Sequence, residues 1–171
     1  MKRGKFRLAL AALSGLLGCA IAGITYWSNT AMATPGFQFN SETLSRSVFE
    51  DIDVKSNVPY THQVKIKTKG TSDVYVVRNR VPPGGYSGWH THPGPSVVSI
   101  RSGVATVYSG DDPSCAPVTY AAGTGFIDEG GGHVHMVRNE GSVELETIAF
   151  QVVPAGADRR IDAPDPGFCP F

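Results

Sequence analysis

The sequence has little charge, few cysteines and no segment with the periodicity of a long amphipathic helix. Charged side chains make up 18% of its 171 residues, and three residues are cysteines. No segment recurs at the period of about 20–50 residues that is typical of solenoid proteins, which excludes a repeat fold. Glycine (20) and proline (12) are abundant, as many tight turns require. The composition indicates one β-rich domain with room for a sizeable core.

The first 33 residues differ from the rest of the chain. Residues 1–7 carry four basic side chains and no acidic one, an apolar stretch follows, and an A-x-A sequence ends at Ala33. This order predicts a secretory signal peptide cleaved after Ala33, and hence a secreted or otherwise extracytoplasmic protein. Two alternatives stay open. The apolar run is long enough for an uncleaved membrane anchor, and residues 16–19, "LLGC", resemble a lipoprotein box with Cys19 as the lipidated residue.

Removal of residues 1–33 changes the charge of the protein. It leaves 11 lysines and arginines against 15 acidic residues, a formal net charge of −4 (11 − 15). A mildly acidic domain lacks the strongly positive surface that binds nucleic acids and anionic lipids. We expect a small-molecule ligand or substrate, no nucleic acid, and a membrane partner only if the N-terminal segment is uncleaved or lipidated.

Cleavage would also leave two cysteines, Cys115 and Cys169, each in a proline-rich segment. In an exported protein such a pair is a good candidate for one disulfide, which would stabilise the fold by about 2–4 kcal/mol. The bond would fasten the C-terminal tail to a loop. The alternative is a pair of free thiols.

The remaining chain divides into three parts. Residues 34–45 have weak periodicity and are expected to form a linker or N-terminal arm, residues 46–155 a β-barrel, and residues 156–171 an irregular tail. Within the barrel, β-branched and polar residues alternate in short runs separated by Gly and Pro, which predicts strands and turns and an all-β sandwich or small barrel. The expected strands lie within residues 47–54, 62–70, 72–81, 96–103, 103–110, 123–130, 132–139 and 142–153.

Four of the five histidines fall into two glycine-flanked clusters, His90 with His92 and His133 with His135. Residues i and i+2 of a strand point to the same face, so a pair spaced in this way can present two imidazoles together. Neutral imidazoles that converge from two strands form an open site for a divalent transition metal. The alternative is a set of exposed histidines on edge strands. His62, alone in its segment, is expected on the surface.

Both clusters match a known family. Residues 84–103 resemble the first cupin motif, G-x5-H-x-H-x3-E-x6-G, and residues 130–139 resemble the second, P-x-G-x2-H-x3-N. The matching positions are Gly84, His90, His92 and Gly103 in the first, and Gly132, His135 and Asn139 in the second. The resemblance covers residues 70–153 and implies a cupin double-stranded β-helix, or jelly-roll barrel, with a metal in its mouth. It also implies His90, His92 and His135 as the metal ligands.

Two positions depart from the motifs. Ser96 stands where the first motif has Glu, and Gly130 stands where the second has Pro. The loss of Glu removes the anionic ligand, so the chain resembles the three-histidine cupins, which include iron dioxygenases such as the thiol dioxygenases. The resemblance implies one divalent transition metal (Fe, Zn, Mn, Ni or Cu) with open positions suited to an anionic, chelating substrate.

Several polar residues are further candidates near this site. His133 is a fourth ligand or proton-transfer group if the strand has begun there, and a residue of the barrel rim otherwise. Ser96 and Glu129 are candidates to lie beside the ligands, although the glycine triplet next to Glu129 favours an exposed loop carboxylate at that position. Polar residues that could line the pocket are Tyr75, Arg80, Tyr108 and Gln151.

Three functions are compatible with these features. The first is an exported metal-binding cupin with Fe(II) dioxygenase-like activity on a small organic substrate. The second is a non-catalytic module at the cell surface that binds a small ligand or a metal. The third is a structural jelly roll with vestigial histidines. No catalytic side chain is assigned. A homodimer is expected because cupins are often dimeric; the alternative is a monomer in which the acidic, proline-rich tail caps a sheet edge.

Overall fold

A computed structural model describes residues 32–171, so the predicted signal peptide and Cys19 lie outside the described part except for Met32 and Ala33. Residues 32–171 contain strands, turns and no α-helix, and none of their elements is a helix that could cross a membrane. The all-β prediction is confirmed. The strands are β1 (Asn40–Phe49), β2 (Asp53–Val58), β3 (His62–Lys67), β4 (Ser72–Val81), β5 (His90–Thr91), β6 (Ser96–Ser102), β7 (Val104–Ser109), β8 (Val118–Ala121), β9 (Gly125–Asp128), β10 (His135–Arg138), β11 (Leu145–Pro154) and β12 (Ile161–Asp162).

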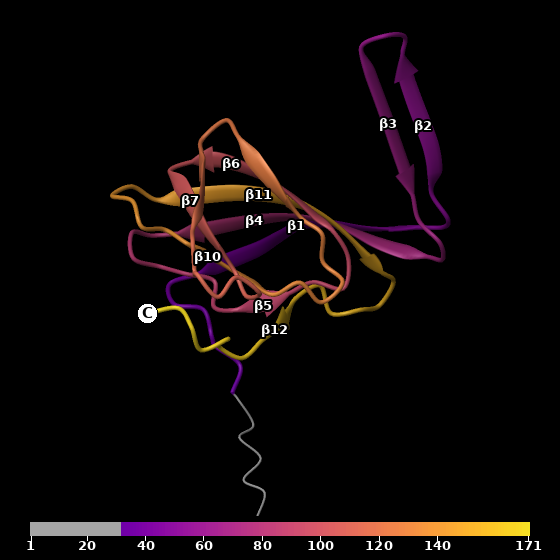
Figure 1. The fold of residues 1–171 in the computed structure, drawn as a ribbon. Coiled ribbons are helices and arrows are strands. Elements are labelled where there is room, and N and C mark those ends of the chain that lie inside the picture. The colour runs from indigo at the N-terminus through magenta and orange to yellow at the C-terminus, as the bar shows by residue number, and fades with distance from the viewer. Residues whose placement is uncertain (1–31) are drawn as a thin grey trace, which may run out of the picture. The chain divides into compact units, whose positions relative to one another are not determined.

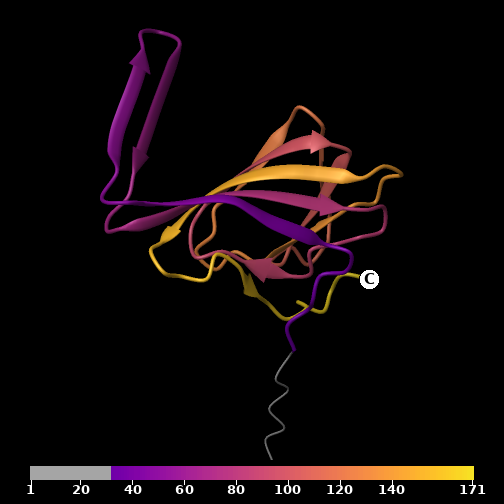
Figure 2. The same ribbon diagram turned by 180° about the vertical axis from the view of Figure 1, so that it is seen from behind.

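The strands form two five-stranded antiparallel sheets and one separate hairpin. The first sheet has the order β1-β4-β11-β6-β9, the second the order β12-β5-β10-β7-β8, and β2 pairs only with β3. Strands adjacent in a sheet are mostly distant in sequence, as Figure 1 shows by the mixture of colours in each sheet. The two larger sheets enclose a common interior (Figures 1 and 2), which gives the jelly-roll barrel that the cupin resemblance implies.

Alternation along the central strands builds the barrel interior. In β11, Leu145, Thr147, Ala149 and Gln151 are buried on one face, while Phe150 on the other is 42% exposed. The apolar end of the interior is closed by Val81, Ile100, Ala105 and Leu145, which pack together. The opposite half of the interior carries the polar residues described below.

The N-terminal part of the domain differs from the sequence prediction. The expected linker over residues 34–45 contains the start of β1, which pairs with β4 from Asn40↔Arg80 to Phe49↔Ser72. Because every residue of this edge strand is exposed, backbone hydrogen bonds and not burial define it, and its side chains show little alternation. The expected strand over 47–54 is two strands, since the chain leaves the barrel after Phe49 and enters the β2–β3 hairpin.

The C-terminal tail is partly ordered by pairing. Two residues of the expected irregular tail, Ile161 and Asp162, form β12 against Thr91 and His90 of β5. Ala163 is buried and packs with Trp89, Tyr108 and Met136. The tail therefore pairs with one edge of β5, the strand that carries His90.

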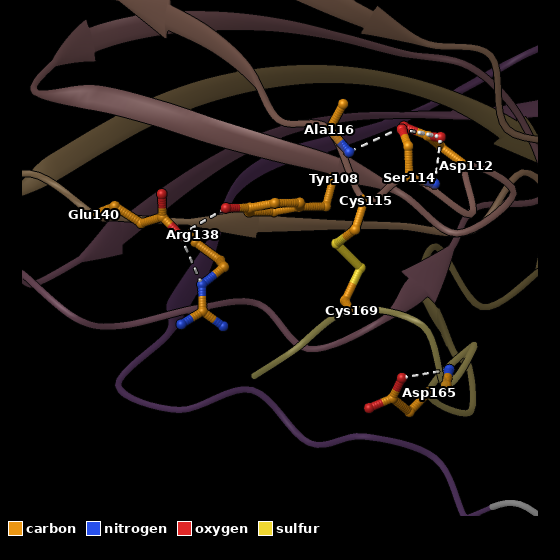
Figure 3. The surroundings of a disulfide bond; sticks show 10 residues. Tyr108, Asp112, Ser114, Cys115, Ala116, Arg138, Glu140, Asp165 and Cys169 are labelled. Atoms are coloured by element: carbon orange, nitrogen blue, oxygen red, sulfur yellow. Dashed lines mark hydrogen bonds and ion pairs between the residues drawn. A yellow bond between two sulfur atoms is a disulfide. The ribbon is translucent and has the colours of Figure 1, made fainter.

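The predicted disulfide is present between Cys115 and Cys169 (Figure 3), with a Cα–Cα distance of 5.4 Å. The loop that contains Cys115 is held in place, because the Asp112 carboxylate accepts hydrogen bonds from the backbone N–H groups of Ser114 and Ala116 on either side of that cysteine. On the other side, the Tyr108 hydroxyl donates to Glu140 at 2.9 Å. The Cys115–Cys169 disulfide ties the C-terminal tail to the β7–β8 loop.

Candidate metal centre

His90, His92 and His135 meet in the barrel interior. His90 on β5 is the direct register partner of His135, the first residue of β10. The sequence predicts His90 and His92 on one strand. In the structure β5 contains only His90 and Thr91, and His92 follows it directly. The ring centroids lie 4.3 Å (His90–His135), 5.0 Å (His90–His92) and 5.5 Å (His92–His135) apart. All three residues are buried, and one ring nitrogen of each lies within 4.8 Å of those of the other two.

The Nδ1 atoms of two of these rings are held by backbone carbonyl groups. His90 Nδ1 lies 2.9 Å from Gly88 O, and His92 Nδ1 lies 2.5 Å from Arg159 O. A carbonyl oxygen only accepts, so both Nδ1 atoms carry the proton and donate. The Nε2 atom of each ring then holds the free lone pair. Nδ1 donation to a protein acceptor is the usual arrangement of a metal-binding imidazole, because it fixes both tautomer and ring orientation.

The third ring faces a carboxylate instead. His135 Nδ1 lies 3.4 Å from Oδ1 of Asp128, whose side chain is 2% exposed. The second carboxylate oxygen of Asp128 has no hydrogen-bond partner within residues 32–171. Asp128 pairs in register with Ser96, the position of the missing motif Glu. A carboxylate therefore does lie beside the histidines, on the strand next to the one where the family motif places it.

Burial keeps the three imidazoles neutral. Loss of solvent, together with the neighbouring His135, Arg160 and His92, holds the pKa of His90 well below its usual value, and burial also lowers the pKa of His92. Burial lowers the pKa of His135 to about 4, although the Asp128 carboxylate acts in the opposite direction. Neutral imidazoles are the form that binds a metal.

The other predicted site residues take different places. Ser96 is buried in the interior, where its hydroxyl accepts a hydrogen bond of 3.0 Å from Gln151 Nε2. Glu129 is exposed, so the carboxylate beside the ligands is its neighbour Asp128. Period-two alternation from Phe126, which faces the cavity, would have identified Asp128.

His133 lies outside the group formed by His90, His92 and His135. It precedes β10, and its side chain is 29% exposed, as the rim alternative expects. Its Nδ1 lies 3.1 Å from Asp128 Oδ1, and its Nε2 lies 3.0 Å from the Ser109 hydroxyl. Asp128 thus contacts His133 and His135 at once, and these three residues form a second group that could hold a metal.

Two motif positions have structural roles. Asn139 is fully buried and donates from Nδ2 to the carbonyl oxygens of Val81 and Val143, which joins the ends of three strands. Gly130 has φ +68°, and a Cβ there would lie 2.3 Å from Gly94 O. Only glycine suits that backbone, and proline is excluded because its φ is fixed near −65°.

The three histidines line a cavity between the two sheets. Its empty space is about 570 Å³, including solvent at the mouth. Of the polar candidates from sequence, Gln151 lines it, whereas Tyr75, Arg80 and Tyr108 do not. No acidic side chain is among its lining residues, which are Phe39, Ser41, Asn79, Val81, His90, His92, Ser96, Val98, Phe126, His135, Val137, Thr147, Ala149, Gln151, Arg159 and Arg160.

Solved structures similar to this chain include a protein with a double-stranded β-helix domain from Klebsiella pneumoniae, 23% identical with a TM-score of 0.45 over 67% of this chain and 84% of that one. A predicted oxalate decarboxylase from Thermotoga maritima is 23% identical, with a TM-score of 0.39 over 50% of this chain and 83% of its own. A DMSP lyase from Ruegeria pomeroyi is 17% identical, with a TM-score of 0.45 over 53% and 43%. No curated protein matches the sequence.

The family comparison agrees with the fold and with the motif positions. The cupin domain family matches residues 77–151, a range that includes His90, His92 and His135. Both sheets of the barrel contribute strands to that range. This match confirms the cupin resemblance and assigns residues 77–151 to the cupin domain family.

Proposed function

We propose that this chain is an exported cupin that binds one divalent transition metal through His90, His92 and His135. The observation that carries the proposal is the set of three buried, neutral imidazoles at the wall of a cavity, two of them with Nδ1 held by a carbonyl oxygen. Three neutral nitrogen donors fit Fe, Zn, Mn, Ni or Cu. The export proposal is supported by the disulfide, a bond typical of oxidising compartments.

With iron as the metal, we propose a dioxygenase-like oxidation of a small organic substrate, in which both atoms of dioxygen end in the product. The bound metal would supply Lewis-acid and redox chemistry. The chain's own residues would orient the substrate and exclude water, since the cavity is lined by apolar side chains such as Val98, Phe126 and Val137 beside the histidines.

A second candidate is a non-catalytic module that binds a metal or a small ligand at the cell surface. The lining of the cavity favours it, because no acidic residue lines the cavity to serve as a general base for a bound substrate. In that case the cavity and the three histidines would hold their ligand without turnover.

We also propose that two copies of the chain form a dimer through the β2–β3 hairpin. Its face with Val54, Val64 and Ile66 is 37–55% exposed, and an isolated two-stranded hairpin is only marginally stable. A second apolar surface lies on the outer face of the first sheet, where Phe150, Val97 and Ile127 are register neighbours. In a symmetric dimer each hairpin would cover this surface of the partner. Light scattering should give twice the chain mass, and V54S/I66S should give the monomer mass.

Metal content tests the proposed site. The exported protein, purified without chelators or an affinity tag, is expected to hold about one equivalent of metal by elemental analysis. His90→Ala/His135→Ala should hold none. His62→Ala, which removes an exposed histidine on the hairpin, should match the parent. A parent without metal that is also not stabilised by added Fe, Zn, Mn, Ni or Cu would contradict the site.

Oxygen consumption separates the two candidates. Protein loaded anaerobically with Fe(II) would be supplied with thiols, diketones and aromatic acids in turn. Turnover above that of His135→Ala favours the dioxygenase-like enzyme. Tight stoichiometric metal with no turnover favours the binding module.

A further inference from the structure

We propose that the cavity binds a small organic anion, with a carboxylate or similar group at Arg159 and a short apolar body against the opposite wall. This inference names the ligand class of the proposed metal site and rests on that function only in sharing its cavity. The evidence is that Arg159 lines the cavity as a partly buried cation without an ion-pair partner. This residue lies in the C-terminal tail, outside the two family motifs.

Arg159 is a half-buried guanidinium without a carboxylate partner. Of the seven arginines in residues 32–171, five form an ion pair with an acidic side chain, and only Arg80 and Arg159 do not. Arg80 is exposed to solvent, which compensates its charge. Arg159 is partly buried, and burial together with the neighbouring Arg160 lowers its pKa. An arginine nevertheless stays charged, so its charge lacks a partner inside the protein.

Two contacts place the Arg159 side chain at the cavity. Its backbone carbonyl accepts the Nδ1 hydrogen of His92, which ties the residue to one of the three candidate ligands. Its Nη2 donates 2.9 Å to the hydroxyl of Ser41, another lining residue. Only one donor of the guanidinium is used by that contact, so the others remain available for a carboxylate.

The adjacent Arg160, unlike Arg159, has a carboxylate partner. Arg160 Nε lies 2.7 Å from Asp162 Oδ1, and its Nη2 donates 2.6 Å to Ser87 O. Asp162 therefore compensates its charge. No acidic residue lines the cavity, and its imidazoles are neutral, so the positive charge of Arg159 is not offset there. A bound divalent metal would add further positive charge. An anion neutralises this charge, whereas a neutral or cationic ligand does not.

The remaining wall fits a short apolar body. Carbon-rich side chains from both sheets surround the space beside the histidines, namely Val81, Val98, Phe126, Val137 and Ala149. A ligand that joins a carboxylate to a short hydrocarbon chain satisfies both the guanidinium and this wall. A dianion without an apolar part would leave the wall unused.

Butanoate and its neutral analogue butanamide probe the inference. Binding to the ¹⁵N-labelled exported protein would be followed by NMR titration, with and without added zinc. We expect butanoate to bind at least tenfold more tightly than butanamide. Arg159→Gln should raise the Kd of butanoate at least tenfold and leave that of butanamide unchanged. Arg80→Gln, which makes the same change of net charge at an exposed position, should leave both unchanged.

Arg159→Lys, which keeps the charge but loses the planar fork, should give an intermediate Kd. Thermal unfolding of each variant checks that the fold is intact. The inference is overturned if butanoate gives no saturable shift, if butanamide binds equally well, or if Arg159→Gln binds butanoate as the parent does. Metal content is measured on the same samples. An absent metal with Arg159-dependent butanoate binding contradicts the metal function alone, and bound metal with no Arg159 dependence contradicts the anion site alone.

Discussion

The barrel and the β2–β3 hairpin have the same alternating sequence pattern but differ in burial. In β11 the alternate residues Leu145, Ala149 and Val153 are no more than 3% exposed. In the hairpin the corresponding face exposes Val64 by 37% and Ile66 by 43%. Alternation therefore specifies a strand and its two faces, while burial depends on whether another sheet covers one of them. The hairpin is a natural control for the barrel, because each change in the interior has a matched change there.

The largest expected contrast is in core packing. Leu145→Ala should lower the free energy of unfolding by about 2–5 kcal/mol, since the side chain is fully buried. Val64→Ala on the hairpin should change it by less than about 0.5 kcal/mol. Urea unfolding at a concentration low enough to keep the chain monomeric measures both. Equal losses would mean that the hairpin is buried against its own barrel.

The disulfide should produce the next largest effect. Cys115→Ser/Cys169→Ser should lose about 2–4 kcal/mol, because the closed loop no longer restricts the unfolded chain. The tail should also open, so that trypsin cleaves more quickly after Arg159 and Arg160. Cleavage after Lys65 in the exposed hairpin should keep its rate and serve as the internal reference. An unchanged rate at both sites would show that β12 alone holds the tail.

The Asp128 carboxylate should affect metal affinity without binding the metal itself. Asp128→Asn removes the carboxylate charge that lies 3.4 Å from His135 Nδ1, and loss of such a neighbour beside a metal-binding imidazole commonly costs about 10–100-fold in metal affinity. Asp53→Asn, which removes an exposed carboxylate of the hairpin, is the matched control. Competition with a zinc chelator dye measures both affinities. A parent-like affinity for Asp128→Asn would assign His135 orientation to packing alone.

The three buried imidazoles should also make the stability of the metal-free protein depend on pH. In the folded state the pKa values of His90, His92 and His135 lie below the ordinary value of about 6.5. The pKa of His135 is lowered to about 4. Between these values the unfolded chain binds more protons, so stability should fall as the pH falls from about 6.5 towards 4. Urea unfolding at pH 7.5 and 5 tests this. His135→Gln should reduce the loss, and His62→Gln on the hairpin should leave it unchanged.

The sequence allowed the barrel and the three histidines to be predicted, because both depend on local spacing. The i, i+2 pairs and the motif glycines are short-range features, and β4 begins and ends where its alternation does. The edge strand β1 could not be predicted in the same way. Its residues from Asn40 to Phe49 are all exposed, and only pairing with the distant β4 makes them a strand.

Arg159 illustrates what local patterns do not contain. It lies in a segment with no periodicity, next to a β12 of two residues. Its position depends on the pairing of β12 with β5, on the His92 contact and on a disulfide that spans 54 residues. Glu129 is predicted as a replacement for the missing motif acid, but the structure leaves it exposed, and alternation in β9 places its neighbour Asp128 inward.

The position of the tail also determines when the cavity is completed. A chain made from its N-terminus can pair β4 with β1 early, but the wall with Arg159 and the sulfur of Cys169 come from its last residues. The barrel can therefore form before the wall that contains Arg159, and this wall becomes fixed only after Cys169 has been synthesised and oxidised. Both a truncated and a reduced chain would keep the three histidines, but the truncated chain would lack Arg159 and the reduced chain would hold it less firmly.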